Sequence, residues 1–224
     1  MKLLIDDANI REIKRLYDLY PIDGVTTNPS ILAKAGLDPK AVLQEIRAFI
    51  GDDALLFAQA LALTAEGMVA DAHRIVEMCG QNTIVKLPSI PEGFKAMKAL
   101  KADGIKTCGT VVYTPMQAFL AAKAGVSFVA PYVNRIDNMG YDGVKVVKEI
   151  QDILVNNHMD CMVLAASFKN SQQVLELCAY GVGSATAAPA VIDSFVKNPA
   201  IDAAVQDFIR DFENATGKTV MTEF

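Results

Sequence analysis

A lysine lies in the middle of a short apolar segment, TIVKLP, that runs from Thr83 to Pro88. The segment has the length and the β-branched composition of a strand, and Asn82 precedes it directly. Lysine is rarely buried unless it is paired or functional, and burial favours the neutral amine, which attacks carbonyl carbons. Lys86 is therefore a candidate nucleophile. The structural alternative is a lysine that reaches solvent from the strand end or pairs with a carboxylate.

Length and composition indicate a soluble protein with one domain over residues 1–224. Hydrophobic residues make up 52% of the 224 positions, and the formal net charge is −5 with both signs spread along the chain. Without a basic cluster, nucleic acid is not expected as a partner. The sequence has no 18-residue apolar run, and its start turns acidic at Asp6, which does not fit a signal peptide. We therefore expect a cytoplasmic protein without membrane partners.

The cysteines and histidines do not have the spacing of a metal site. Cys79, Cys108, Cys161 and Cys178 form no CxxC pair, and the two histidines of the chain are far apart in sequence. Most of the thiols are expected to be buried and free. Neither a metal centre nor a Ser-His-Asp triad is indicated, and we expect no cofactor.

Eight strand-like segments alternate with amphipathic helical segments. The strand-like segments cover residues 2–6, 24–28, 55–61, 83–88, 106–113, 127–134, 162–167 and 182–187. This alternation predicts parallel strands joined by right-handed crossovers, either in a closed barrel or in an open doubly wound sheet. The count of eight favours a (β/α)8 TIM barrel, and the absence of GxGxxG after the first strand weakens the alternative. A further helix at about 199–214 must cover a barrel end or a neighbouring subunit.

Polar residues gather near the carboxyl ends of these segments, where TIM-barrel enzymes have their active sites. Lys86 shares parity with Ile84, so it points into the barrel if Val85 and Leu87 pack beneath the helices. The other polar residues within or just after the segments are Asp6, Thr26, Asn28, Gln59, Thr110, Tyr132, Asn134, Arg135 and Ser167. Each alone fits capping, strand propensity or an ordinary core position, but together they would cost much desolvation in a core built only for packing.

The types of these residues indicate a chemistry. One amine, one carboxylate, several hydroxyl and amide groups and one guanidinium suit Schiff-base formation on a polyhydroxylated carbonyl compound. Neutral donors and acceptors bind sugar hydroxyls, and Arg135 is suited to hold a phosphate.

Several segments, in order over nearly the whole chain, resemble the transaldolase superfamily. They are GVTTNPS at 24–30, FAQ at 57–59, IVKLP at 84–88, GTVVY at 109–113, APYVNRID at 130–137 and AASFK at 165–169. The resemblance is greatest for the fructose-6-phosphate aldolase branch, because transaldolases proper carry glutamate in place of Gln59 and phenylalanine in place of Tyr132. Glutamine only orients a water, so in this branch the tyrosine must move the proton.

The resemblance implies roles for the polar residues. Lys86 corresponds to the Schiff-base lysine and Tyr132 to the general acid/base. The remaining correspondences place Gln59 and Thr110 at a catalytic water, Asp6, Asn28 and Ser167 around the donor hydroxyls and the reacting amine, Arg135 and Ser167 at the phosphate, and Thr26 beside the same site. The resemblance also implies a homo-oligomer, a pentamer often paired into a decamer, with the last helix packed on a neighbouring subunit.

The sequence therefore predicts a class I, metal-independent aldolase. Its expected reaction is reversible cleavage of fructose 6-phosphate, or a related sugar phosphate, into dihydroxyacetone and an aldehyde such as glyceraldehyde 3-phosphate. The alternatives are a transaldolase and a barrel that binds sugar phosphates without catalysis. Cys108, Val111, Thr114 and the late Pro189 depart from the family pattern, and these departures bear on acceptor preference.

Overall fold

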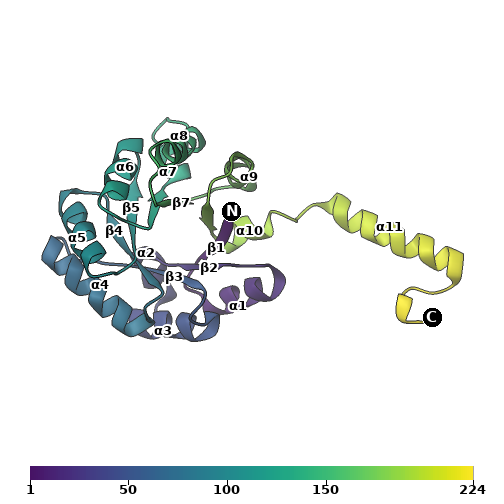
Figure 1. Ribbon diagram of the computed structural model, residues 1–224. Coiled ribbons are helices and arrows are strands. Elements are labelled where there is room, and N and C mark those ends of the chain that lie inside the picture. Colours follow the sequence, from purple (N-terminus) through teal and green to yellow (C-terminus); the bar gives the residue numbers. More distant parts are fainter. Residues whose placement is uncertain (224) are drawn as a thin grey trace.

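Eight parallel strands close into a barrel in the order of the sequence, and β8 pairs back onto β1. The computed structural model describes residues 1–223, and Figure 1 shows the helices arranged around the outside of the strands. The strands are β1 (Lys2–Asp6), β2 (Gly24–Thr26), β3 (Leu55–Gln59), β4 (Thr83–Pro88), β5 (Thr107–Val112), β6 (Phe128–Pro131), β7 (Met162–Ala165) and β8 (Ser184–Ala187). The prediction of a (β/α)8 TIM barrel, rather than an open sheet, is confirmed.

The helices begin at the proline and cap signals of the sequence. They are α1 (Ile10–Leu19), α2 (Pro29–Ala35), α3 (Pro39–Ile50), α4 (Ala65–Cys79), α5 (Pro91–Ala102), α6 (Pro115–Lys123), α7 (Val133–Asp137), α8 (Gly143–Asn156), α9 (Ser171–Tyr180), α10 (Pro189–Asp193) and α11 (Pro199–Thr216), followed by a 3-10 turn (Met221–Glu223). Asn9 caps α1, and its side chain accepts the backbone N–H of Arg11. Such caps satisfy N–H groups that a helix start leaves free.

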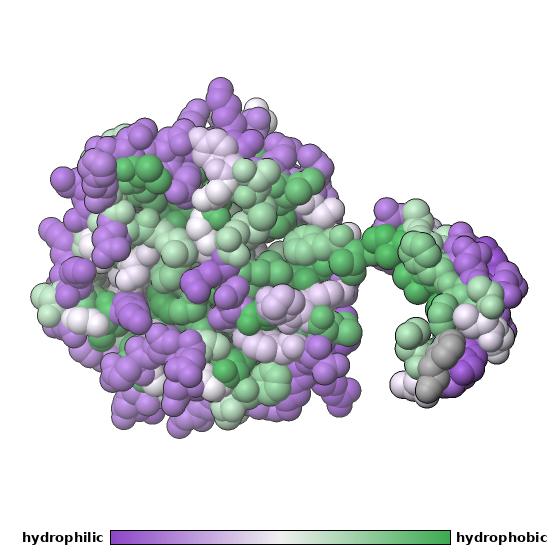
Figure 2. All heavy atoms as spheres, turned by 45° about the vertical axis from the view of Figure 1, so that its right-hand side comes forward, coloured by the Kyte–Doolittle hydropathy of each residue, from purple (hydrophilic) through white to green (hydrophobic). Residues whose placement is uncertain are grey.

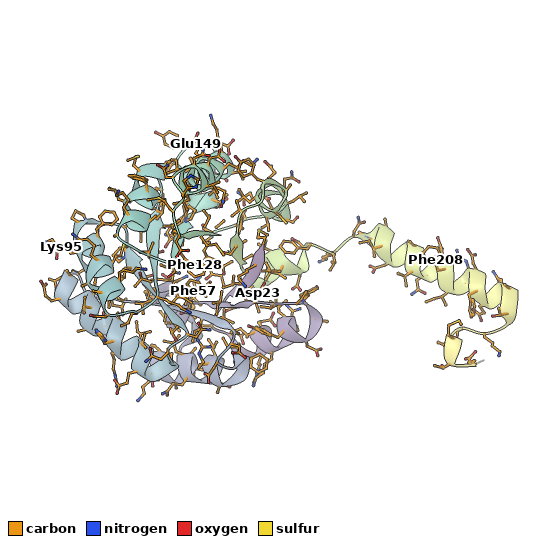
Figure 3. The ribbon with its side chains drawn as sticks, in the orientation of Figure 1. Asp23, Phe57, Lys95, Phe128, Glu149 and Phe208 are labelled. Carbon is orange, nitrogen blue, oxygen red and sulfur yellow. The ribbon has the colours of Figure 1, made fainter. Side chains whose placement is uncertain are left out.

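Two apolar layers hold the barrel together. Inside it, a cluster is formed by Leu4, Phe57, Ile84, Cys108, Phe128, Ala130 and Leu164. The rings of Phe57 and Phe128 meet edge-to-face with centroids 5.1 Å apart (Figure 3). Val85 and Leu87 belong instead to the outer layer that packs against the helices. The predicted alternation along β4, which turns Lys86 inward, is therefore confirmed.

Close packing fixes the carboxyl end of β4. Gly93, in the first turn of α5, lies so close to the strand that a Cβ atom at this position would be 1.8 Å from the carbonyl oxygen of Pro88. Only glycine permits this approach without displacement of the backbone. The helix therefore sits directly against the strand end that presents Lys86.

Several strands end sooner than the sequence predicted. β2 ends at Thr26, so Asn28 is not on a strand but caps α2, where its side chain accepts the N–H of Ile31 at 3.0 Å. β3 likewise ends at Gln59, not at residue 61. A strand ends where its neighbour no longer pairs with it, and the apolar character of a segment does not show this position. A polar residue just beyond the strand can instead cap the next helix, as Asn28 does.

The sixth and seventh strands also need correction. Tyr132 follows β6 and makes a single bridge to Ala166, whereas Asn134 and Arg135 lie on the short helix α7 rather than on or directly after the strand. β7 ends at Ala165, so Ser167 follows it by two residues. These residues still lie at the carboxyl end of the barrel, because the turn into α7 starts there.

The last helix departs from the barrel. α11 extends to one side (Figure 1), and none of its residues is buried. Ile201, Val205 and Phe208 are 49%, 49% and 73% exposed, and Figure 2 shows apolar atoms along one side of the helix and its connecting segment. An amphipathic helix in this position leaves its apolar side without cover from its own barrel.

Among residues 1–223, no helix has both the length and the hydropathy needed to cross a membrane.

Candidate active site

Lys86 is buried inside the barrel, with 4% of its surface exposed. In the strand register it lies between Gln59 of β3 and Cys108 of β5. Its Nζ atom donates a hydrogen bond to the backbone oxygen of Thr27 at 3.1 Å. No carboxylate forms a salt bridge with it among the described residues. The lysine neither reaches solvent nor pairs with an acid, so both structural alternatives for it fail.

A cavity of about 290 Å³ opens directly above Lys86. Seven of the residues singled out in the sequence line it: Asp6, Asn28, Gln59, Lys86, Tyr132, Arg135 and Ser167. Thr26 and Thr110 lie behind this lining, each hydrogen-bonded to one of its members. The fold thus brings together nine of the ten candidate residues, from seven different strands or the segments that follow them, whereas Asn134 of α7 does not line the cavity. A cavity of this size suits a small-molecule ligand.

Tyr132 is held by three contacts. Its hydroxyl and that of Thr110 are 2.8 Å apart, and the ring of Tyr113 meets its ring edge-on at 5.6 Å. The guanidinium of Arg135 lies over the Tyr132 ring, 4.6 Å from the centroid. A hydrogen bond with Tyr113 raises the pKa of Arg135, so this side chain stays cationic at the cavity wall. A phenol fixed in this way can exchange a proton with a group in the cavity.

Asp6 is the carboxylate of the site. Burial raises its pKa, while the nearby charge of Lys86 and the hydrogen bond from Thr26 act in the opposite direction. The Thr26 hydroxyl donates to Asp6 Oδ1 at 2.7 Å and is 2.6 Å from the hydroxyl of Thr186. A carboxyl group with this balance of influences can both hold and release a proton.

Sequence reasoning missed several residues of the cavity wall. Thr186 is the clearest case, and Ser30 also lines the cavity, as does Val111, which the sequence marked only as a departure from the family pattern. Thr186 could have been found, because it is a polar residue within the eighth strand-like segment. Val111 has a backbone φ of 59°, a strained value for a β-branched residue, at a point where the pairing of β5 with β6 shifts register. No sequence signal marks such a bulge.

Two of the four free thiols lie in the core and Cys161 is half-buried, so the prediction that most of the cysteines are buried holds for only half of them. Cys79 and Cys108 are buried, whereas Cys178 is exposed. Burial raises the pKa of Cys108 to about 12, so its thiol does not compete with Lys86 as a nucleophile.

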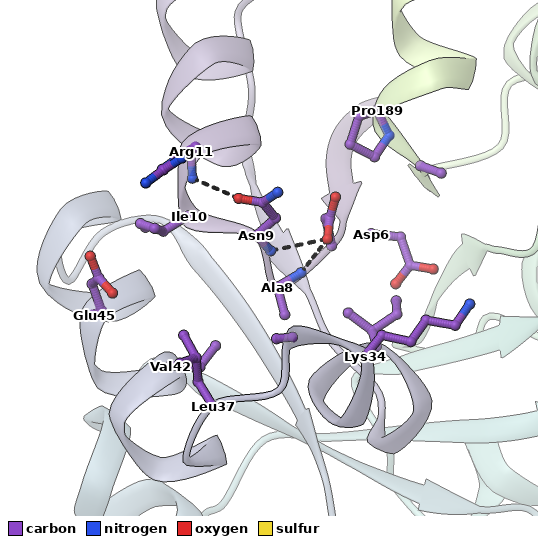
Figure 4. A pocket seen from close by; sticks show the side chains of 14 residues that line it. Asp6, Ala8, Asn9, Ile10, Arg11, Lys34, Leu37, Val42, Glu45 and Pro189 are labelled. Carbon is purple, nitrogen blue, oxygen red and sulfur yellow. Dashed lines mark hydrogen bonds between the residues drawn. The ribbon is translucent and has the colours of Figure 1, made fainter.

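A larger cavity of about 800 Å³ adjoins Asp6 on the outer side (Figure 4). Asp7 does not offer a free carboxylate there, because its Oδ1 accepts the backbone N–H groups of Ala8 and Asn9 at 2.7 and 3.0 Å. Figure 4 shows Arg11 and Lys34 on opposite sides of this cavity.

A family model described as transaldolase/fructose-6-phosphate aldolase matches residues 3–223 of this sequence. The chain belongs to this family. The match covers β1 from Leu3, the other seven strands and every residue of the candidate site, so this barrel is that of an enzyme family of the aldolase and transaldolase type.

Solved structures share the fold at low sequence identity. A structure described as native KDPGal has a TM-score of 0.60 and 18% identity over 84% of this chain and 82% of that chain. A cube-shaped, highly porous protein cage designed by fusing symmetric oligomeric domains has a TM-score of 0.62 and 15% identity over 97% of this chain and 80% of that chain. At such identities the likeness concerns the architecture alone.

Proposed function

We propose that this chain is a class I aldolase that cleaves fructose 6-phosphate, or a related sugar phosphate, through a Schiff base on Lys86. The observation that carries the proposal is the position of the Lys86 amine. It is buried, has one backbone acceptor, and lies at the floor of a cavity whose wall holds Tyr132, with the Tyr132 hydroxyl hydrogen-bonded to Thr110 behind the wall. A desolvated amine next to a positioned acid/base is what iminium chemistry needs.

In this mechanism the Lys86 amine attacks the ketone carbon, and loss of water gives an iminium that draws electrons from the neighbouring bond. Tyr132 gives its proton to the hydroxyl that leaves as this water and is then a phenolate. Through a water held by Gln59 and Thr110, the phenolate takes the proton of the hydroxyl on C4 as the C3–C4 bond breaks, and Tyr132 later returns this proton to the enamine. The aldehyde leaves, and the remaining enamine is protonated and hydrolysed to release dihydroxyacetone and the free amine. Positioned proton transfer of this kind contributes roughly 10²–10⁴-fold to the rate.

The other polar residues are assigned to substrate binding in this proposal. Asp6 and Asn28 contact the donor hydroxyls and the reacting amine, and Thr26 supports Asp6 from behind. Arg135 and Ser167 line the cavity on the side of α7 and hold the phosphate. Their place in one cavity supports these roles.

The principal experiment is reduction with borohydride in the presence of dihydroxyacetone, followed by peptide mass analysis. We expect one covalent adduct, located on Lys86. The Lys86→Met variant should not be labelled, whereas Lys98→Met, which removes an exposed lysine on α5, should be labelled as the wild type is. An unlabelled wild-type protein, or an adduct on another lysine, would contradict the proposal.

A transaldolase is the second candidate, because the family includes both activities. Gln59 and Tyr132 favour the aldolase, since glutamine cannot ionise and the phenol is the nearer proton carrier. Cleavage of fructose 6-phosphate should be measured with and without erythrose 4-phosphate. We expect cleavage without the acceptor; a strict requirement for it would favour the transferase.

We also propose a cytoplasmic homo-oligomer, a pentamer or decamer, in which α11 covers a neighbouring subunit. The exposed Val205 and Phe208 on a helix that leaves its own barrel support this arrangement. Phe208→Asp should lower the mass measured by light scattering, whereas Gln206→Asp, which adds the same charge to the helix without removal of an apolar side chain, should not. A Phe208→Asp protein of unchanged mass would contradict the role of this helix.

A further inference from the structure

Three side chains from three adjacent strands form a chain of hydrogen bonds beneath the candidate active site. Asp6 of β1, Thr26 of β2 and Thr186 of β8 take part, with oxygen–oxygen distances of 2.7 Å and 2.6 Å. Thr26 is fully buried and Thr186 is 2% exposed, so water does not replace these bonds freely. Thr186 also lines the cavity above Lys86.

Proton counting allows two arrangements of this chain. Each hydroxyl carries one hydrogen, and each of the two short contacts holds one. When Asp6 is ionised, Thr186 donates to Thr26, and Thr26 donates to Asp6 Oδ1. When Asp6 Oδ1 carries a proton, Asp6 donates to Thr26, Thr26 must donate to Thr186, and the Thr186 hydrogen turns toward the cavity.

The second arrangement depends on Thr186. Without an oxygen at position 186, a protonated Asp6 Oδ1 would leave the hydroxyl hydrogen of Thr26 buried with no acceptor. An unsatisfied buried donor costs free energy. When Asp6 is ionised, loss of the Thr186 hydroxyl is less costly, because the Thr26 hydroxyl still donates to Asp6 and only one lone pair of its oxygen lacks a donor. Removal of the Thr186 hydroxyl therefore penalises the protonated carboxyl more than the carboxylate.

The charged groups on the surrounding elements do not by themselves determine whether Asp6 is protonated or ionised. Lys86 from β4 and Arg135 from α7 favour the ionised carboxyl, while burial and Asp7 favour the protonated one. The adjoining outer cavity adds Lys34, and farther away Arg11 and Glu45. Because these influences oppose one another, the hydrogen bonds of Thr26 and Thr186 can change the pKa of Asp6.

We propose that Thr186 is a positioning residue that lets Asp6 hold a proton on Oδ1, by accepting the hydrogen that Thr26 then turns away from the carboxyl. The hydroxyl chain is thus a support with two hydrogen-bond arrangements, one for the ionised and one for the protonated carboxyl group of Asp6. This inference deepens the role proposed for Asp6 and rests on it, but its test does not depend on which substrate the enzyme cleaves.

The test is a pH titration of the Asp6 carboxyl carbon by NMR in ¹³C-labelled protein, with the resonance assigned by its loss in Asp6→Asn. In Thr186→Val the midpoint should move to lower pH by about one unit, which is a tenfold weaker proton affinity. Thr186→Ser keeps the hydroxyl and should restore the wild-type midpoint. Thr107→Val is the matched control, because the buried Thr107 hydroxyl on β5 has no hydrogen-bond partner among the described residues.

Two results would overturn the proposal. An unchanged midpoint in a folded Thr186→Val protein would place the proton on Oδ2, where Thr26 need not turn. A shifted midpoint in Thr186→Ser would assign the effect to the lost methyl group rather than the hydroxyl, and this variant remains informative if the valine variant does not fold. Failure of borohydride labelling at Lys86 would instead overturn the proposed function and leave the titration result standing.

Discussion

Two buried basic side chains lie at opposite ends of the barrel, and their surroundings differ. Lys86, on β4, is 4% exposed and donates to one backbone oxygen, that of Thr27. Arg47, on α3, is 8% exposed and lies by the amino-terminal ends of β3 and β4. Its guanidinium donates to the backbone oxygens of Gly51, Ala54, Cys79 and Asn82, at 2.7 to 3.4 Å, and to the hydroxyl of Thr83.

The difference separates a basic side chain with a structural role from one that is placed to react. Arg47 satisfies carbonyl groups at helix and strand ends that would otherwise be buried without a donor. Its planar fork suits this fixed set of acceptors. Lys86 meets one acceptor and faces a cavity, so its amine is free to react. Burial alone therefore does not distinguish a reactive basic side chain from a structural one. The number of hydrogen bonds that the side chain donates distinguishes these two.

The largest effect should follow from loss of the free amine. Lys86→Met should lower kcat/KM for sugar-phosphate cleavage by about 10⁴-fold or more, because no covalent intermediate can form. The protein should remain folded, since methionine fills a similar volume and no salt bridge is broken. Steady-state kinetics with circular dichroism would check this. Activity of Lys86→Met near that of the wild type would show that Lys86 is not the nucleophile and would remove the functional distinction between Lys86 and Arg47.

Tyr132→Phe should have the next largest effect on the rate. It removes the hydroxyl that pairs with Thr110 but leaves the ring between Tyr113 and Arg135. We expect a loss of roughly 10²–10⁴-fold in kcat, with Lys86 still labelled by borohydride. Tyr141→Phe, in the exposed segment before α8, is the control. Equal loss in both variants would argue against a proton-transfer role.

Arg47→Met should affect stability and not chemistry. Loss of five hydrogen bonds leaves buried acceptors unpaired, and we expect the free energy of unfolding to fall by about 3 kcal/mol. The kcat of the folded enzyme should not change. Arg74→Met, which breaks an exposed pair with Glu77, should cost under about 1 kcal/mol. Urea unfolding with activity assays would check both variants. A lower kcat in folded Arg47→Met would contradict a purely structural role for Arg47.

The smallest effect concerns pH. Burial raises the pKa of Asp6 above its ordinary value of 3.8, so its contribution to stability is greatest below that value and is lost as pH rises through the folded-state pKa. Asp6→Asn cannot ionise and should be more stable than the wild type near pH 7, with the gain disappearing at about pH 3.8 and below. Urea midpoints across this range, with Asp18→Asn as an exposed control, would show it; a gain that persists in acid would contradict the sign.

The roles of Lys86 and Arg47 also differ in how well the sequence predicts them. A lysine within an apolar strand is unusual, and the alternation along residues 83–88 predicted its direction correctly. Arg47 gave no such signal, because an arginine within an amphipathic helix ordinarily faces solvent. Its role depends on carbonyl groups from residues 51–82, which only the packing of α3 against the ends of β3 and β4 brings within reach.

The sequence by itself determined the β/α alternation, the inward face of β4 and the polar residues that gather at one end of the strands. These follow from local periodicity and from the cost of burial, which each segment carries in its own composition. The tertiary structure alone decided where strands stop, that Tyr132 and Arg135 meet the cavity from the start of α7, and that Thr186 joins Asp6 through Thr26. Those contacts connect residues up to 160 positions apart. They depend on closure of the barrel between β8 and β1, which no local pattern encodes.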